Sequence, residues 1–343
     1  MVKNESSPTG VVSPLSGFLL VLRQRVRRTV KRDLAGTVVL LALLLGLSGL
    51  LEVPPPLRRH TGDITVVVHT PFWVGRSFYL NSVTDYASRW LLMYLFLTTL
   101  LMLPLSALLG ARSVPGLQEA SSTAETLLTR LNAYEISLAR LLAGLGPLLG
   151  ALIISLVFWI LARVYFNFNL NLNGLSANSF NSFFTVGVGA IATAHLVLVA
   201  AIFMVGASGA LFASRSEPGA WWPRGAVVGF LLCLFCLGGI VLLDGTVSCF
   251  ENPVPWIDIL LLANPIAAIS GILKVDILRA TWFYQHTQAH DYPFAYPDPL
   301  LASGIYLVVG ACCILLASWR MRHAYREGNT LTGAASSVRS ARR

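Results

Sequence analysis

Carboxylate and hydroxyl side chains gather in one short segment of the chain, and they are the first candidates for chemistry. Glu119, Glu125 and Glu135 lie close in sequence to Thr123, a composition that would suit acid–base catalysis. The same residues also suit helix ends, because a hydroxyl caps exposed amides and acids oppose the helix dipole. No HExxH, GxSxG or Cys/His metal spacing accompanies them. We therefore expect helix-terminal roles for these acids, no catalytic site and no metal site.

The lysines of the chain exclude ATP binding through a Walker motif. The sequence contains only Lys3, Lys31 and Lys274, and none of them follows a glycine. The GK[ST] core of a phosphate-binding loop therefore cannot be built. We expect no cofactor on this chain, and any ATP-dependent activity would need a separate subunit.

The composition is that of an integral membrane protein. Hydrophobic residues make up 55% of the chain and charged residues only 12%, about half the charged share of a soluble domain. The formal charge of +9 would attract nucleic acid, but the basic residues cluster at the ends of apolar runs, as membrane topology requires. Membrane lipids are therefore expected as partners, and nucleic acid is not.

Six apolar runs are predicted to cross the membrane as helices, each close to the ~20 residues that a bilayer core requires. They cover approximately residues 34–51, 90–109, 136–162, 184–213, 226–243 and 300–319. The second run contains Pro104, which is tolerated where a neighbouring helix satisfies the freed carbonyl. The fold class is thus all-α, with a six-span domain over 34–319.

Three flanking segments complete the predicted layout. Residues 1–33 contain an amphipathic helix with a strongly basic polar face, which suits the inner membrane interface. Residues 259–273 are apolar but too short to cross comfortably and are broken by Pro265, so they are predicted to form a re-entrant or surface hairpin. Residues 320–343 form a basic cytoplasmic tail.

Charge asymmetry predicts the orientation of the spans. Both termini, the segment before the third span and the loop at Arg215 are rich in basic residues, whereas residues 244–298 contain six acids. The positive-inside rule places the basic segments in the cytoplasm. We therefore expect a multi-pass protein of the cell (inner) membrane with both termini cytoplasmic.

His195 lies inside the predicted fourth span. An ionisable residue within a membrane is a functional hypothesis by default, so His195 is a candidate polar site. The alternative, which we prefer, is a core histidine whose ring nitrogens are satisfied by neighbouring groups. The Cys233–Cys236 pair lies in an apolar run without acid or histidine neighbours and is interpreted as core filler.

The segment before the third span resembles the signature region of ABC-2 type transporter permeases. The shared elements are Glu119, Thr123 with Glu125, Leu127 with Leu128, and Glu135 with Ile136, with Pro104 and Val114 upstream. The resemblance implies a permease that pairs with a second permease copy or paralogue and with two ATPase subunits, which bind ATP and Mg. It also implies export.

In such a permease the cytoplasmic helix between spans two and three couples ATP hydrolysis to the membrane domain. The resemblance places this coupling helix around residues 117–132. Glu119, Thr123, Glu125 and Arg130 would then contact the ATPase, and Glu135 and Arg140 would hold the base of the third span.

Two other functions stay open on the sequence alone. A membrane scaffold or assembly subunit would use the same segment to recruit a cytoplasmic partner without a transport cycle. An ion-coupled carrier would centre on His195, although acids are nearly absent from the spans. The hydroxyls in the spans, such as Thr98 and Thr99, fit a lipid, a drug, a polysaccharide or a hydrophobic peptide equally well.

Overall fold

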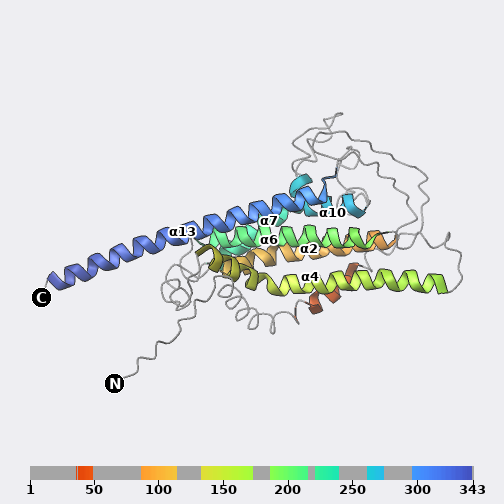
Figure 1. Ribbon diagram of the computed structural model, residues 1–343, viewed down its shortest axis with the longest axis horizontal. Coiled ribbons are helices and arrows are strands. Elements are labelled where there is room, and N and C mark those ends of the chain that lie inside the picture. The colour runs from red at the N-terminus through yellow and green to blue at the C-terminus, as the bar shows by residue number, and fades with distance from the viewer. Residues whose placement is uncertain are drawn as a thin grey trace, which may run out of the picture.

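The computed structural model of the chain describes residues 36, 38–48, 86–113, 133–172, 186–214, 221–238, 261–273 and 296–341. Within these ranges the regular structure is entirely helical, which confirms the predicted all-α class for this part of the chain. The main helices, shown in Figure 1, are α2 (Tyr86–Ser113), α4 (Ala133–Leu172), α6 (Val188–Ala213), α7 (Trp221–Gly238), α10 (Pro265–Leu273) and α13 (Pro299–Ala341).

Four of these helices are long and apolar enough to cross a membrane. Their apolar parts are Trp90–Ser113, Tyr134–Tyr165, Val188–Ala213 and Pro299–Arg320. They match the second, third, fourth and sixth predicted spans. Two shorter apolar helices are Val38–Ser48, which lies within the first predicted span, and Trp222–Leu234, which overlaps the fifth. Both predicted spans extend beyond the described residues.

Two helices are longer than the sequence analysis predicts. Helix α4 continues to Leu172 and α13 continues to Ala341, because neither 151–172 nor 320–341 contains a proline that would end it. The predicted amphipathic helix within residues 1–33 and the coupling helix at 117–132 lie outside the described residues.

Helices α2 and α4 run in opposite directions. Near the start of α2, Trp90 packs against Trp159 in the second half of α4, with ring centroids 5.2 Å apart. Near the start of α4, a Cβ added at Gly144 would lie 3.3 Å from the carbonyl oxygen of Leu109, close to the end of α2. Residues 114–132, named the connector here, therefore join two helix ends that pack together.

The remaining long helices alternate in the same way. His195 of α6 bonds to Ser155 of α4, and Gly206 of α6 lies against Leu145 of α4, so α6 is antiparallel to α4 and parallel to α2. Gly310 of α13 lies against Phe203 of α6, and Arg320 donates to the Leu211 carbonyl, so α13 runs parallel to α6. Helix α7 runs antiparallel to α2. The bundle thus has a connector end, where α2 and α6 end, and a far end.

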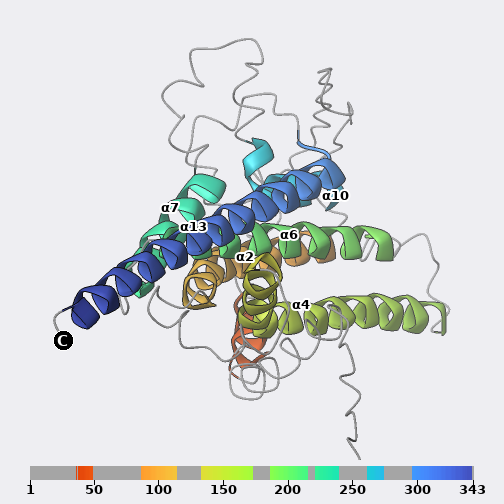
Figure 2. The ribbon, with the colours of Figure 1, turned by 60° about the vertical axis from the view of Figure 1, so that its left-hand side comes forward.

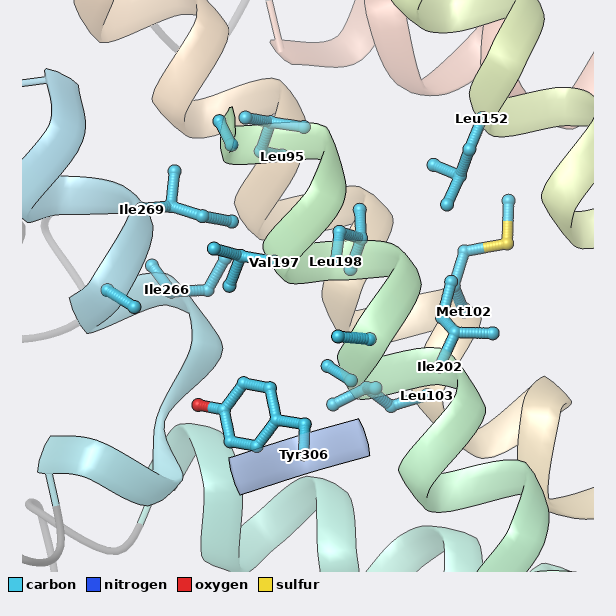
Figure 3. Close-up of a cluster of buried hydrophobic side chains, with 14 of the residues drawn as sticks. Leu95, Met102, Leu103, Leu152, Val197, Leu198, Ile202, Ile266, Ile269 and Tyr306 are labelled. Atoms are coloured by element: carbon cyan, nitrogen blue, oxygen red, sulfur yellow. The ribbon is translucent and has the colours of Figure 1, made fainter. Parts of the chain in front are cut away.

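Helix α6 is the centre of the bundle and contacts each of the other five. Figure 3 shows its Val197, Leu198 and Ile202 among core side chains of α2, α4, α10 and α13. Its closest neighbour is α2, where Gly110 and Gly206 bring the two backbones into direct contact. Small residues allow such close approach, and the resulting dispersion contacts hold membrane helices together.

Helix α10 is a nine-residue helix at the far end and is too short to cross a bilayer. Its side chains from Pro265 to Gly271 are all buried. Asn264 caps the helix, since its Oδ1 accepts hydrogen bonds from the amides of Ile266 at 2.9 Å and Ala267 at 3.3 Å. The Tyr306 hydroxyl of α13 donates to the carbonyl of Leu262 at 2.8 Å and ties the preceding turn to the bundle.

Candidate functional site

A buried polar cluster lies inside the helix bundle and centres on His195. The His195 side chain is only 3% exposed. Its Nδ1 lies 2.9 Å from the carbonyl oxygen of Ile191, and a carbonyl can only accept, so Nδ1 carries a hydrogen. In the neutral ring Nε2 is then an acceptor, and it lies 3.1 Å from Ser155 Oγ. The Ser155 hydroxyl therefore donates to His195, and both ring nitrogens are satisfied.

The Ser155 hydroxyl behaves differently from other buried hydroxyls in the described helices. Most of them donate back to a carbonyl three or four residues earlier in their own helix, which is the usual arrangement for Ser and Thr in membrane helices. Such hydroxyls belong to Thr99, Ser106, Ser113, Ser208, Ser214, Ser270, Ser303 and Ser318. Ser155 instead bonds across to α6, so its hydrogen bond joins two helices.

Helix α2 contributes a third member to the cluster. The Tyr94 hydroxyl, which is buried, interacts with the side chains of Ser155 and Thr98. Tyr94 therefore lies beside the hydroxyls of both Ser155 and Thr98. Thr98 Oγ1 is also buried, and no group among the described residues makes a hydrogen bond of normal geometry with it. The polar side chains of Tyr94, Ser155 and His195 therefore gather where α2, α4 and α6 meet, and the Ser155–His195 hydrogen bond joins α4 to α6.

Aromatic rings cover the cluster on the far-end side. Trp159 lies one helical turn after Ser155 and packs against Tyr94, with ring centroids 5.7 Å apart, as well as against Trp90. The Trp90 indole nitrogen donates to Ser48 Oγ at 3.1 Å, which brings the helix Val38–Ser48 to the same place. Four helices thus meet around one small polar group surrounded by aromatic rings.

The cluster offers hydrogen-bond donors and acceptors from a histidine, a serine and a tyrosine. In the described part of the chain, no three His, Cys, Asp or Glu side chains come together as metal ligands would. The histidine bonds to Ser155 and to the Ile191 carbonyl, and the tyrosine lies beside the serine. An interhelical hydrogen bond such as Ser155–His195 holds helices together in a membrane.

The predicted coupling residues fall into two groups. Glu119, Thr123, Glu125 and Arg130 lie in the connector, outside the described residues. Glu135 and Arg140 lie in the first turns of α4, where Glu135 is partly exposed and Arg140 is only 6% exposed. The helix dipole stabilises an acid in the first turn, which agrees with the helix-terminal role expected for Glu135.

The site thus contains one residue that sequence reasoning selects, His195, and partners that it does not. Thr98 is noted in the sequence only as a scattered hydroxyl, and Tyr94 and Ser155 are not selected at all. The available signal is weak: Ser155 and Trp159 are spaced by four in an apolar run, which places them on one helix face. The spacing shows that the two residues share a face, but it does not show which helix this face contacts.

The chain matches no known protein family, and no curated protein is similar to it in sequence.

Proposed function

We propose that this chain is the membrane permease subunit of an ATP-driven transporter of the ABC-2 type, acting as an exporter. The ATPase is a separate chain, present in two copies, and a second permease copy or paralogue completes the assembly. The transport pathway lies between the two permeases. The connector binds the ATPase through Glu119, Thr123, Glu125 and Arg130.

The observation that carries this proposal is the packing of α2 against α4 beside the connector. Gly144 of α4 fits against the backbone at Leu109 and the side chain of Ser113, in the last turns of α2. Because α2 in turn packs tightly on α6 at Gly110 and Gly206, movement of the connector acts on three helices together. A coupling segment requires such an arrangement. ATP bound to the ATPase would act through a rigid contact with the connector and shift the bundle between two conformations.

The charges of the described residues support a cytoplasmic connector. Arg112, Arg140, Arg224 and Arg320 lie toward the connector end, whereas Arg163 and Asp298 lie toward the far end. Trp222 and Trp319, both exposed, lie toward the connector end as well, where tryptophan anchors a membrane interface. By the positive-inside rule the connector faces the cytoplasm, where an ATPase subunit would bind.

The experiment is to purify the tagged full chain from its native membranes and measure the ATPase that co-purifies. We expect a stoichiometric ATPase whose hydrolysis is stimulated by this chain and loses that stimulation in Glu119→Arg and Glu125→Arg. Glu217→Arg, a charge reversal in the segment joining α6 to α7 at the same end of the bundle, is the matched control and leaves stimulation intact.

Each alternative predicts a different result in the same preparations. A scaffold would retain a bound partner without any ATP-dependent transport. An ion-coupled carrier would lose uptake in His195→Ala and keep it when the ATPase is removed. Full stimulation in both connector variants would overturn the coupling role.

A further inference from the structure

Helix α6 has an outward-facing side near the connector end. Ser208 of α6 lies 3.6 Å from Cys313 of α13, measured from Oγ to Sγ, and Gly209 lies against the backbone of Ala107 on α2. Phe212 comes four residues after Ser208 and three after Gly209, so it points between α13 and α2. Its side chain is 53% exposed. The described helices therefore leave α6 open in this direction.

Helices α7 and α13 border this open side. Helix α7 packs on α2 near Ala107 and Ala111, whereas α4 packs near Leu109 and Ser113. Residues two apart on a helix point to nearly opposite sides, so α7 and α4 lie on opposite sides of α2. Figure 2 shows the same arrangement, with α4 on one side of α6 and with α7 and α13 on the other.

Helix α7 presents a cation and an apolar side chain beside α6. Arg224, Val228 and Leu231 are spaced by four and three residues, so they share one face of α7. Gly225 and Gly229 are the residues that face α2, and α7 also contacts α6. The buried Val228 therefore marks the side of α7 next to α6, and the exposed Arg224 and Leu231 flank it.

Helix α13 presents the same pair of chemistries. Cys313, Leu316 and Arg320 are spaced by three and four residues and share one face. Cys313 meets α6, and the Arg320 guanidinium donates to the Leu211 carbonyl at 3.5 Å, at the end of α6. Arg320 ends the apolar part of α13, and Arg224 lies in the first turn of α7. Both guanidinium groups therefore lie where their helices leave the bilayer core.

From this arrangement we propose that Arg224 and Arg320 bind the phosphate headgroup of one anionic phospholipid. Its acyl chains lie along Phe212, Leu231 and Leu316, and these five residues are named the lipid surface. Arginine suits this role because its planar guanidinium donates several hydrogen bonds to phosphate oxygens. Basic sites between membrane helices at the cytoplasmic side bind such headgroups. The inference does not depend on the proposed function, because it uses only the charges and the membrane level of these residues.

The charge of the connector end favours an anionic lipid over a zwitterionic one. Among the residues whose side chains the structure describes, Glu135 is the only acid at this end, and it lies on α4, on the other side of α2. The lipid surface thus combines two cations at the membrane surface with exposed apolar side chains, of which Leu316 is 48% exposed. A lipid with a net negative headgroup complements both parts, whereas a zwitterionic headgroup brings no net charge to the arginines.

The test measures which lipid the full chain retains. Native mass spectrometry is applied to protein released from micelles that contain equal amounts of phosphatidylglycerol and phosphatidylcholine. We expect the unmodified chain to retain one phosphatidylglycerol in preference to phosphatidylcholine. Arg224→Gln and Arg320→Gln should each lower this preference about fivefold, the factor expected for one basic residue at a membrane surface. Arg320→Lys keeps the charge and should lower it less.

Arg112→Gln is the matched control. Arg112 is exposed at the same end of the bundle, but it comes two residues after Gly110, which faces α6. It therefore points away from α6 and from the lipid surface, and its replacement should leave the preference unchanged. The unfolding temperature in phosphatidylcholine alone checks that each variant is folded.

An equal loss of preference in Arg112→Gln would overturn the proposal, because it would mean that the lipid is attracted by any basic residue at this end. An unchanged preference in the variant that carries both Arg224→Gln and Arg320→Gln would overturn it as well. A photoreactive phosphatidylglycerol in phosphatidylcholine nanodiscs should crosslink to both α7 and α13. Crosslinks confined to other helices would contradict the assigned location.

Discussion

The thiol of Cys233 on α7 donates a hydrogen bond to the backbone carbonyl of Leu100 on α2, with a sulfur–oxygen distance of 3.7 Å. Leu100 is four residues before Pro104, and proline has no amide hydrogen to return to that carbonyl. Pro104 also lies against Gly229 of α7, where an added Cβ would be 3.0 Å from the proline Cα. Helix α7 therefore supplies both a donor and a close surface at the proline of α2.

This relationship predicts that Cys233 and Pro104 are energetically coupled. In the native chain Cys233→Ala should lower the free energy of unfolding by about 1 kcal/mol, since the Leu100 carbonyl loses its partner. In a Pro104→Ala background the new amide bonds that carbonyl, so the same change should cost less by about 0.5 kcal/mol or more. Unfolding in mixed micelles, followed by circular dichroism, measures the four variants. An equal loss of unfolding free energy in the two backgrounds would show that the thiol does not compensate for the missing amide of Pro104.

The contact between α2 and α6 predicts a graded series of glycine variants. An added Cβ at Gly110 would overlap the backbone of Gly206, so Gly110→Ala should destabilise the protein by about 2–3 kcal/mol. At Gly206 the nearest atoms belong to the flexible Leu145 side chain, 3.0 Å away, so the cost should be about 1 kcal/mol. At Gly304 nothing lies within 4 Å, and alanine should stabilise α13 slightly.

Thermal unfolding in a single detergent ranks these three variants. If Gly110→Ala were as stable as Gly304→Ala, the two backbones would not be in contact in the folded protein.

The buried cap of α10 should matter more than the exposed cap of α13. Asn264→Ala leaves two buried amides without their acceptor and should cost about 1–2 kcal/mol, and Asn264→Ser should restore much of this loss. Asp298 accepts from the amides of Leu300 and Leu301 at 2.9 and 3.0 Å in an exposed position. Water can replace it there, so Asp298→Ala should cost about 0.5 kcal/mol.

Both cap variants are compared by unfolding in the same micelles. A larger loss for Asp298→Ala than for Asn264→Ala would contradict the burial argument.

The hydrogen bond between Ser155 and His195 should appear as a coupling energy. Polar contacts between membrane helices contribute about 0.6 kcal/mol on average and up to about 1.7 kcal/mol. A double-mutant cycle of Ser155→Ala and His195→Phe should give a value in this range. Thr193→Ala is the control, because Thr193 lies two residues from His195 but bonds to the carbonyl of Gly189 in its own helix. Its effect should add to that of Ser155→Ala without coupling.

The sequence by itself determined the features that depend on local composition and length. Apolar runs long enough to cross a bilayer fix an all-helical membrane protein, and four of the predicted spans appear as helices of the required length. Helix α10 is short because Pro265 begins it and the apolar segment is brief. Pro104 predicts a neighbouring helix that satisfies the freed carbonyl, because lipid offers no partner to a backbone group. Each of these conclusions needs only the residues of one segment.

Only the tertiary structure decided which residues meet. His195 is conspicuous in the sequence, but its partner Ser155 lies 40 positions away on another helix, and Tyr94, beside Ser155, lies on a third. Helical periodicity states which face of a helix a residue occupies and not which neighbour faces it. In the same way, Cys233 is interpreted as apolar filler in the sequence until α7 is placed against Leu100. Packing between helices is non-local, and the sequence of one helix does not contain it.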